Sequence, residues 1–294
     1  MANSISFASK YSGDIDKIIA QGAKTGFLAD NTFKAKFSGA STVYLPEVSM
    51  DGLGDYSRTN GYSKGDTNLT FTPYTLNMER SKQLFLDAQD ADESGVADLA
   101  GKLVGEYTRT KVIPETDAYN ISALAKIAAQ ASHSSTLTAG KEVAGLLELI
   151  NNAEEACAYE SGNLIALVNH VIYGALQTST ELSRYITVNN FSQGGIDLKV
   201  KNLNGVNIIP VDKSRMFNEF NFTDNGFTPT DSAKAVHALV LPKDSASFVK
   251  KVYKCDAYNP SQVQDYDAYK INFRLYYDLI VKTSRKGTIF ALTA

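Results

Sequence analysis

The stretch that decides the fold spans residues 44–119. It reads YLPEVSMDGLGDYSRTNGYSKGD from residue 44, NLTFTPYTLNMERSKQLFLDAQDADESG from residue 68, and RTKVIPETDAY over residues 109–119. Residues 41–50 and 67–77 are typical of two paired strands, since apolar residues alternate with polar ones over part of the second run. The segment between them is rich in glycine and contains Asn60-Gly61, a turn signal. We therefore predict a long two-stranded arm with a polar tip.

An arm of this length cannot bury both of its faces on its own body. Pro46 and Pro73 restrict the two strands to edge or irregular positions, where a proline disrupts no ladder. A glycine-rich, charged tip suits a loop that lies over a neighbouring molecule. The alternative is a surface loop that contacts nothing. We expect the arm to contact another copy of the chain.

The rest of the chain mixes helices and strands, with no visible repeat or linker. An apolar stripe predicts a helix over residues 93–113, with acidic residues at its start. Pro114 is expected to end this helix and to open the next one. Further expected elements are a helix at 138–158, a buried strand at Leu164–Val168, a short helix at 170–178, strands and turns within 188–209, a polar-aromatic loop at 216–232, a strand at 236–241, and a closing pair of strands at 267–280 and 287–292.

Composition bounds the class of protein. The chain has 294 residues, 44% hydrophobic and 21% charged, which is ordinary for a globular protein. A net charge of −3 excludes a basic nucleic-acid reader. Two distant cysteines, Cys157 and Cys255, fit free thiols in a reducing compartment. No secretory signal and no long apolar run is present, so we expect a soluble chain with no membrane contact.

The residue types that usually carry catalysis or metal binding are present, but their spacing does not match any known catalytic or metal-binding motif. Gly140-Lys141 is followed by Glu142, not by the Ser or Thr of a phosphate-binding loop. The acidic run from Asp90 places Gly101 where a calcium loop needs Glu, so helix capping explains it better. Each histidine lacks a second ligand at metal spacing, and Cys157 is better explained as a packed thiol. The three histidines are His133, His170 and His237. From these patterns we expect no enzyme activity, no cofactor and no metal.

The order of these motifs resembles that of the major capsid proteins of tailed bacteriophages with the Hong Kong 97-type fold. The resemblance is strongest for phages and prophages of low-GC Gram-positive bacteria. It rests on the arm sequence, on DAQDADES before the helix, and on TKVIPETDAY. Two later segments agree, NLNGVNIIPVDKSRM at residues 202–216 and DAYKINFRLYYDLIVKTSRKGTIF at residues 267–290.

The resemblance implies an α+β fold with four parts. Residues 1–40 would be an N-terminal arm, and 41–88 an extended β-hairpin called the E-loop. Residues 89–137 and 241–294 would form a peripheral domain around a spine helix. Residues 138–240 would form a mixed axial domain.

The resemblance also implies a function. The chain would be a structural head protein that assembles through pentamers and hexamers into an icosahedral shell around double-stranded DNA, without sequence-specific DNA binding. Expected further partners are a separate scaffolding protein, a portal and decoration proteins. The expected location is the virion, after assembly in the bacterial cytoplasm. The candidate subunit-contact residues are Asp51, Asp55, Tyr56, Arg58, Tyr62, Lys64 and Arg80.

Three alternatives stay open. An encapsulin-like nanocompartment shell would share the fold and enclose enzymes instead of a genome. An unrelated soluble α/β enzyme would be a stable monomer with a ligand pocket. A phage tail-tube or sheath protein would form helical tubes, although the expected helical content argues against it.

Overall fold

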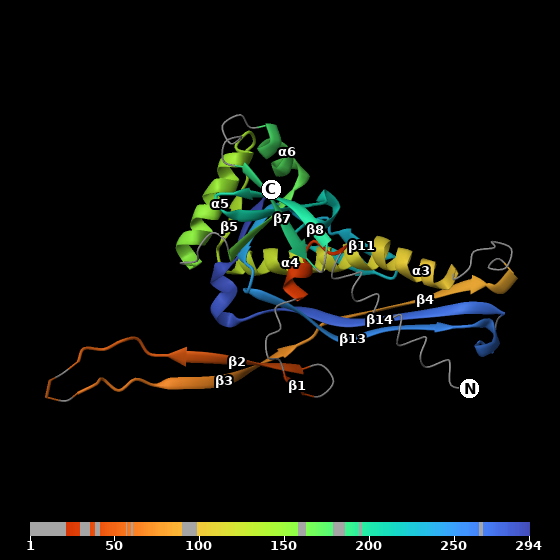
Figure 1. Ribbon diagram of the computed structural model, residues 1–294, viewed down its shortest axis with the longest axis horizontal. Helices are drawn as coiled ribbons and strands as arrows, with labels where there is room; N and C mark the ends of the chain where they lie inside the picture. The colour runs from red at the N-terminus through yellow and green to blue at the C-terminus, as the bar shows by residue number, and fades with distance from the viewer. Residues whose placement is uncertain are drawn as a thin grey trace.

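The computed structural model of the protein describes residues 22–29, 36–38, 42–56, 58–59, 61–89, 99–157, 163–178, 186–193, 196–264 and 267–294. Figure 1 shows an α+β molecule with a compact mixed body, a long narrow sheet beside it, and an arm that projects past the body. The described strands form four sheets, of seven, three, three and two strands. The expected fold class is therefore confirmed. Most of the N-terminal arm and the acidic run at 90–98 lie outside the described residues.

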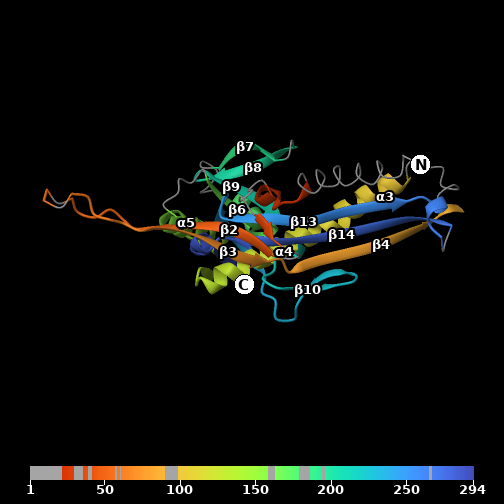
Figure 2. The same cartoon turned by 90° about the horizontal axis from the view of Figure 1, so that it is seen from below.

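The arm consists of two antiparallel strands, β2 (Thr42–Met50) and β3 (Thr67–Thr75). A short strand, β1 (Lys36–Ser38), pairs with the first residues of β2. The views in Figures 1 and 2 show the pair extending as a thin ribbon away from every other element. Both predicted strands are confirmed.

A long antiparallel sheet carries the chain onward from the arm. Its strand order is β13 (Ala246–Tyr258), β14 (Ala268–Val281) and β4 (Met78–Asp87). Strand β13 is not among the elements predicted from the sequence, and the expected pairing of 267–280 with 287–292 is wrong. A 3-10 turn, η6 (Thr283–Thr288), carries the chain out of this sheet, so that β15 (Phe290–Thr293) joins the seven-stranded one instead. A second 3-10 turn, η5 (Pro260–Gln262), follows β13.

One nearly continuous spine helix lies along the long sheet (Figure 1). It comprises α3 (Leu99–Tyr107), a π-helical turn η2 (Thr108–Val112) and α4 (Ile113–Gln130). Pro114 lies in the first turn of α4 and does not end the helix. Because a proline has no N–H, one hydrogen bond to the preceding turn of the helix is lost here. The chain instead makes a wider turn in which the Ile113 N–H bonds to the Thr108 carbonyl, and the helix continues.

The seven-stranded sheet forms the core of the body, in the order β5-β15-β12-β6-β9-β8-β7. Its strands besides β15 are β5 (Ser134–Thr136), β6 (Leu164–Asn169), β7 (Ile186–Gln193), β8 (Ile196–Leu203), β9 (Val206–Val211) and β12 (Val236–Pro242). The strands predicted within 188–209 and at 236–241 are confirmed.

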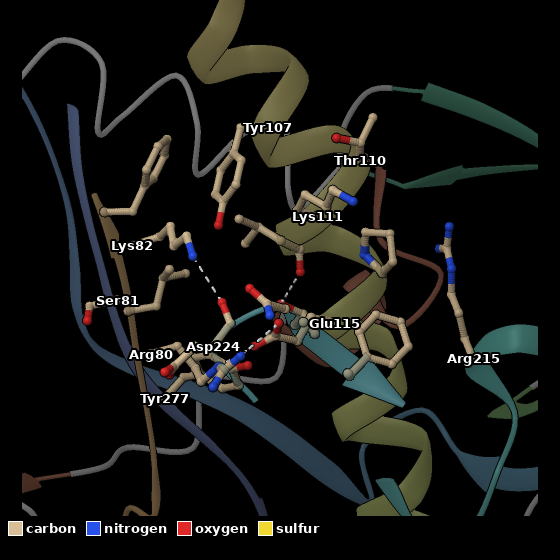
Figure 3. Close-up of a pocket in the computed structure, with 18 of the residues that line it drawn as sticks. Arg80, Ser81, Lys82, Tyr107, Thr110, Lys111, Glu115, Arg215, Asp224 and Tyr277 are labelled. Atoms are coloured by element: carbon tan, nitrogen blue, oxygen red, sulfur yellow. Dashed lines mark hydrogen bonds and ion pairs between the residues drawn. The ribbon is translucent and has the colours of Figure 1, made fainter. Parts of the chain in front are cut away.

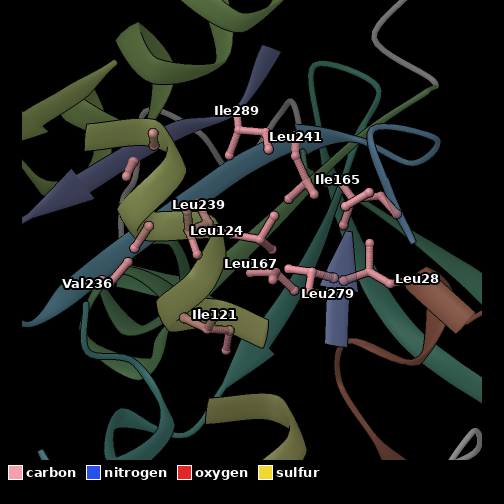
Figure 4. Close-up of a cluster of buried hydrophobic side chains, with 14 of the residues drawn as sticks. Leu28, Ile121, Leu124, Ile165, Leu167, Val236, Leu239, Leu241, Leu279 and Ile289 are labelled. Atoms are coloured by element: carbon pink, nitrogen blue, oxygen red, sulfur yellow. The ribbon is translucent and has the colours of Figure 1, made fainter. Parts of the chain in front are cut away.

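Helices cover both faces of this sheet. On one face, Ile121 and Leu124 of α4 pack against Ile165 and Leu167 of β6 (Figure 4). On the other face, α5 (Glu142–Cys157) and α6 (His170–Thr178) pack against alternate residues of β6, such as Ala166. Since both faces are covered, all six residues of β6 are buried, which explains its unbroken apolar run. The predicted buried strand and both helices are confirmed.

The expected loop at 216–232 contains a small hairpin. Its strands are β10 (Phe220–Thr223) and β11 (Gly226–Pro229), joined by a turn at Asp224 and Asn225. Gly226 has φ +123°, a conformation that favours glycine. The Phe220 and Phe227 rings lie 5.4 Å apart, so aromatic packing holds a segment that the polar sequence suggested was irregular. Two 3-10 turns, η1 (Gly26–Ala29) and η4 (Lys213–Arg215), complete the described elements.

Candidate assembly surface

One face of the arm is an exposed apolar surface. The register pairs Val48 with Leu69 and Pro46 with Phe71, and residues directly opposite in an antiparallel pair lie on the same face. Because side chains alternate along a strand, Met50 shares this face. The exposed fractions are 59% for Val48, 70% for Met50, 55% for Leu69 and 48% for Phe71. We call the set of Pro46, Val48, Met50, Leu69 and Phe71 the apolar arm face.

The opposite face of the arm is anchored to the body near its root. Val43 and Leu45 are fully buried and pack with Leu76 and with Ile280 of β14. This face becomes polar toward the tip, where Ser49 pairs with Asn68. The arm is therefore held at its root by one face while the apolar arm face points away from its own body. Isolated exposed apolar residues need no explanation, but a contiguous row of them marks an interaction site.

The tip continues the exposed surface with aromatic and charged groups. The Tyr56 and Tyr62 rings meet edge to face at 5.3 Å, with exposed fractions of 63% and 89%. The Asp51 carboxylate accepts a 2.8 Å hydrogen bond from the Asp66 N–H, which closes the base of the tip. Gly61 adopts φ +76° at the predicted turn.

The predicted contact residues fall into two groups. Asp51, Asp55, Tyr56, Arg58, Tyr62 and Lys64 all lie exposed at the tip, and no ion pair joins the charged ones to another described residue. Arg80 lies apart from them on β4, where its Nε is 2.6 Å from Oε1 of Glu115 on the spine helix. Its Nη2 also donates to the Thr223 carbonyl at 2.7 Å. Arg80 thus contacts groups of its own subunit.

The apolar arm face is not predicted from the sequence. The sequence pattern predicts contacts at aromatic and charged residues of the tip and does not single out Val48, Met50, Leu69 and Phe71. The signal that identifies these four is the strand register, which places apolar residues of both strands on one face. That register is not readable from the two strand sequences alone.

Buried carboxylates fix the root of the arm and the end of the N-terminal segment. Asp278 of β14 accepts hydrogen bonds from the Tyr119 hydroxyl and from the N–H of Asn77, the residue that joins β3 to β4. Asp117 of the spine helix is fully buried and accepts from the N–H and hydroxyl of Thr25. Both attachments converge on α4, so the arm and the N-terminal segment share one helical support.

The histidines and cysteines have structural surroundings. His133 stacks on Phe290 with ring centroids 4.3 Å apart, and His237 Nδ1 lies 2.9 Å from the Asn169 side-chain nitrogen. Burial raises the pKa of the Cys157 thiol and, with Asp256 adding to the effect, raises the pKa of Cys255 to about 12, so neither is an activated thiolate. Within the described ranges, no three His, Cys, Asp or Glu side chains gather as a metal site would require.

Two remaining features of the sequence are placed by the structure. The Gly140 N–H donates to the carboxylate of Glu142, the first residue of α5, so this side chain closes the turn that precedes the helix. In the part of the chain that the structure describes, no helix has the length and apolar character needed to cross a bilayer.

The arrangement of arm, spine helix, long sheet and mixed body is that of the Hong Kong 97-type capsid fold. No family model matches the sequence, and a search of curated proteins gave no match. Solved structures share the fold. The capsid structure of the Cyanophage P-SCSP1u matches with a TM-score of 0.59 at 15% identity, covering 88% of this chain and 85% of that one.

Two further solved structures extend the comparison. The mature capsid of bacteriophage PhiM1 matches with a TM-score of 0.53 at 14% identity, covering 86% of this chain and 82% of that one. The virus-like particle from Pyrococcus furiosus matches with a TM-score of 0.55 at 10% identity, covering 97% of this chain and 99% of that one. At sequence identities this low, the structural matches show that the fold is shared and show nothing about function.

Proposed function

We propose that this chain is the major capsid protein of a tailed bacteriophage, which self-assembles into an icosahedral shell around double-stranded DNA. The observation that carries the proposal is the apolar arm face, which projects from the body and on which Val48, Met50 and Leu69 are each at least 55% exposed. Shell-forming folds among the solved relatives support it. The chain acts by self-association and needs no catalytic group.

The arm defines the contact that would build the shell. In a closed ring of five or six subunits each contact joins two different surfaces, so the arm face would bind a different surface of the neighbour and the contact would be heterologous. Heterologous contacts close into rings when the rotation permits, here pentamers and hexamers. The arm of each subunit would lie over its neighbour, with Asp51, Asp55, Arg58 and Lys64 at the rim. Exposed ion pairs contribute only about 0–1 kcal/mol each, so the apolar arm face supplies most of the contact energy.

The proposed parts follow the fold. An N-terminal arm spans 1–40, the E-loop 41–88, the peripheral domain 89–137 and 241–294, and the axial domain 138–240. The pairing of β4 with β14 supports an E-loop whose projecting portion ends at Thr75 and whose last strand belongs to the peripheral sheet.

The proposed partners are other copies of the chain, a separate scaffolding protein, a portal and decoration proteins. Packaged DNA would be enclosed without sequence-specific binding, which suits a net charge of −3. The proposed location is the virion, after assembly in the bacterial cytoplasm.

A second candidate is an encapsulin-like compartment shell that encloses protein cargo. The nearly complete mutual coverage with the virus-like particle from Pyrococcus furiosus supports it. The two candidates share the assembly mechanism and differ in contents.

Negative-stain electron microscopy with size-exclusion chromatography tests the proposal. Closed polyhedral particles, or pentamers and hexamers that convert to them, are expected from the purified chain, alone or with its scaffolding protein. Particles purified from the native host should contain DNA for a capsid and a defined protein for a compartment. A 32 kDa monomer that stays monomeric at high concentration, with and without scaffolding protein, would contradict both.

A further inference from the structure

A cavity of about 510 Å³ lies between the spine helix, strand β4 and the β10–β11 hairpin. Figure 3 shows Arg80 and Lys82 on the β4 wall, Asp224 of the hairpin turn beside Lys82, and Lys111 on the helical wall with its ammonium directed away from Lys82. The volume falls in the range of small-ligand pockets. It suits a few side chains of a bound segment and is too small for a folded domain.

The inner wall of the cavity is apolar and aromatic. Tyr107 and Phe273 contribute rings whose centroids lie 4.8 Å apart, and Phe227, Leu275 and the buried Tyr277 also line it. The Tyr107 hydroxyl has no hydrogen bond to a described residue, although its side chain is only half-exposed. An aromatic wall with one open hydroxyl favours a ligand that carries an aromatic or large aliphatic side chain.

The charges around the cavity do not balance. Arg80 is paired with Glu115, and Arg215 with Asp117 at 3.0 Å. The Lys82 ammonium donates only to a neutral group, the Asp224 carbonyl, at 3.0 Å. Lys111 has no ion pair or hydrogen bond with the residues described. The lining thus holds four cationic side chains and two carboxylates, Glu115 and Asp224, and neither Lys82 nor Lys111 forms an ion pair with a described residue. An anionic group of a ligand would pair with these ammonium groups.

The backbone is shaped around the same space. The π-helical turn places three consecutive residues, Thr110, Lys111 and Val112, on the cavity wall. Single π-turns inside α-helices are found frequently at functional sites. The hairpin turn on the opposite wall is held by Arg80 through the Thr223 carbonyl and by Lys82 through the Asp224 carbonyl. A carboxylate is a stronger acceptor for the Lys82 ammonium than this neutral carbonyl.

We propose that this cavity binds an acidic peptide segment of another protein, in which a carboxylate lies next to an aromatic or large aliphatic side chain. The apolar side chain would contact Tyr107 and Phe273, and carboxylates on its two sides would pair separately with Lys82 and with Lys111. A nucleic-acid strand fits less well, because Glu115 and Asp224 offset part of the positive charge of the lining, which then suits one or two carboxylates and not a run of successive phosphates. The site goes beyond the proposed shell function, and peptide binding can be measured whether or not the chain assembles.

Fluorescence anisotropy with a fluorescein-labelled peptide, Gly-Asp-Phe-Asp-Leu-Gly, tests the proposal on the full chain. Saturable binding is expected. The double variant Lys82→Gln/Lys111→Gln should weaken it about tenfold through loss of both charges. Thr110→Trp should weaken it by filling the cavity without changing its charge. Lys102→Gln, an exposed lysine on the same helix outside the cavity lining, is the matched control and should bind as wild type does.

Two control peptides and an oligonucleotide complete the design. Replacing both Asp by Asn, or Phe and Leu by Gly, should weaken binding at least fivefold if both halves of the cavity are used. Absence of saturable binding up to millimolar peptide overturns the proposal, as does equal binding by wild type and both cavity variants. A labelled oligothymidylate that binds more tightly than the peptide, and loses affinity in Lys82→Gln/Lys111→Gln, would overturn it in favour of nucleic acid.

Discussion

The Tyr119 hydroxyl donates a 2.6 Å hydrogen bond to Oδ1 of Asp278, and this contact joins the spine helix to the long sheet at the root of the arm. The same carboxylate accepts the N–H of Asn77 at 2.9 Å and the N–H of Leu279 at 2.7 Å. Burial, and then the hydrogen bond from Tyr119 to Asp278, raise the pKa of Tyr119, so it stays a donor at any physiological pH. One buried carboxylate thus sets where the arm leaves the body.

Replacing Asp278 by Asn should destabilise the unassembled chain by about 2–3 kcal/mol, because an amide cannot accept from donors on both of its sides. Tyr119→Phe removes one donor and should cost about 1 kcal/mol. Urea unfolding, with m-values compared to ensure the same transition, measures both. Equal stability of Asp278→Asn and wild type would mean that the carboxylate does not support the root of the arm.

Asp117→Asn should loosen the segment that includes η1. The fully buried carboxylate accepts from the Lys24 N–H, the Thr25 N–H and hydroxyl, and Nη1 of Arg215. Losing the charge leaves Arg215 without its counter-ion, at a cost of about 2–3 kcal/mol. Hydrogen exchange should then accelerate over residues 23–29 before it does so elsewhere.

The matched control for that prediction is Glu106→Gln on the same helix. Its pair with Arg109 is exposed on both sides, at 57% and 70%, so its loss should change stability by less than about 1 kcal/mol. If exchange over 23–29 were as fast in Glu106→Gln as in Asp117→Asn, the effect would belong to the helix and not to the buried contact.

The sequence predicted those elements whose signals are local. The arm strands, β6 and the helices each carry their own periodicity or turn residues. Strand β13 does not, because one face of the three-stranded sheet is partly exposed and Lys250 and Lys251 interrupt its alternation. The sequence also does not determine which sheet β15 joins. Its apolar run fits either sheet, and only tertiary packing decides between them.

The candidate surface shows the same limit. Its tip residues are exposed in the structure, and Gly and charged residues indicate a loop there, but their role as subunit contacts stays a prediction. The apolar arm face needs the pairing of Val48 with Leu69, which the long tip loop does not specify. Arg80 was grouped with the tip by its position in the sequence, whereas its partner Glu115 is brought close only by folding.

The lowered pKa of His237 predicts that the folded chain loses stability in mild acid. Burial, and then the charge of Lys213, lower its pKa, while Glu142 works in the opposite direction. The folded chain therefore binds this proton at a lower pH than the unfolded chain, whose histidine titrates near 6.5. The stabilisation is complete above about pH 6.5 and decreases as the pH falls below it. Thermal unfolding between pH 7.5 and 5 should show this slope in wild type and a flatter one in His237→Gln.

The exposed His170 provides the control for the acid response. His170→Gln makes the same substitution at an exposed position on α6, and its slope is measured beside that of His237→Gln. Carboxylates with lowered pKa, such as Asp212, lose their contribution only at pH values below about 4, outside this window. Identical slopes for His237→Gln and wild type would show that His237 does not carry the response.

Assembly should depend on the apolar arm face more than on the charges of the tip. The triple variant Val48→Ser/Leu69→Ser/Phe71→Ser removes side chains that are at least 48% exposed in the single chain, so its unfolding free energy should stay within about 1 kcal/mol of wild type. Burial of each of these side chains at a subunit contact would contribute about 1.5–3 kcal/mol. The concentration needed for assembly, measured by light scattering and electron microscopy, should therefore rise more than a hundredfold.

Two comparisons separate the apolar contact from a general effect on the arm. Ser49→Ala/Asn68→Ala alters a directly opposed pair on the other face of the same strands and should leave assembly unchanged. Deleting residues 51–66 and closing the hairpin with Asn-Gly keeps the strands and removes the tip. If the tip supplies only rim contacts, this deletion should weaken assembly less than the triple variant does. Assembly of the triple variant at the wild-type concentration would show that the apolar arm face does not supply the contact energy.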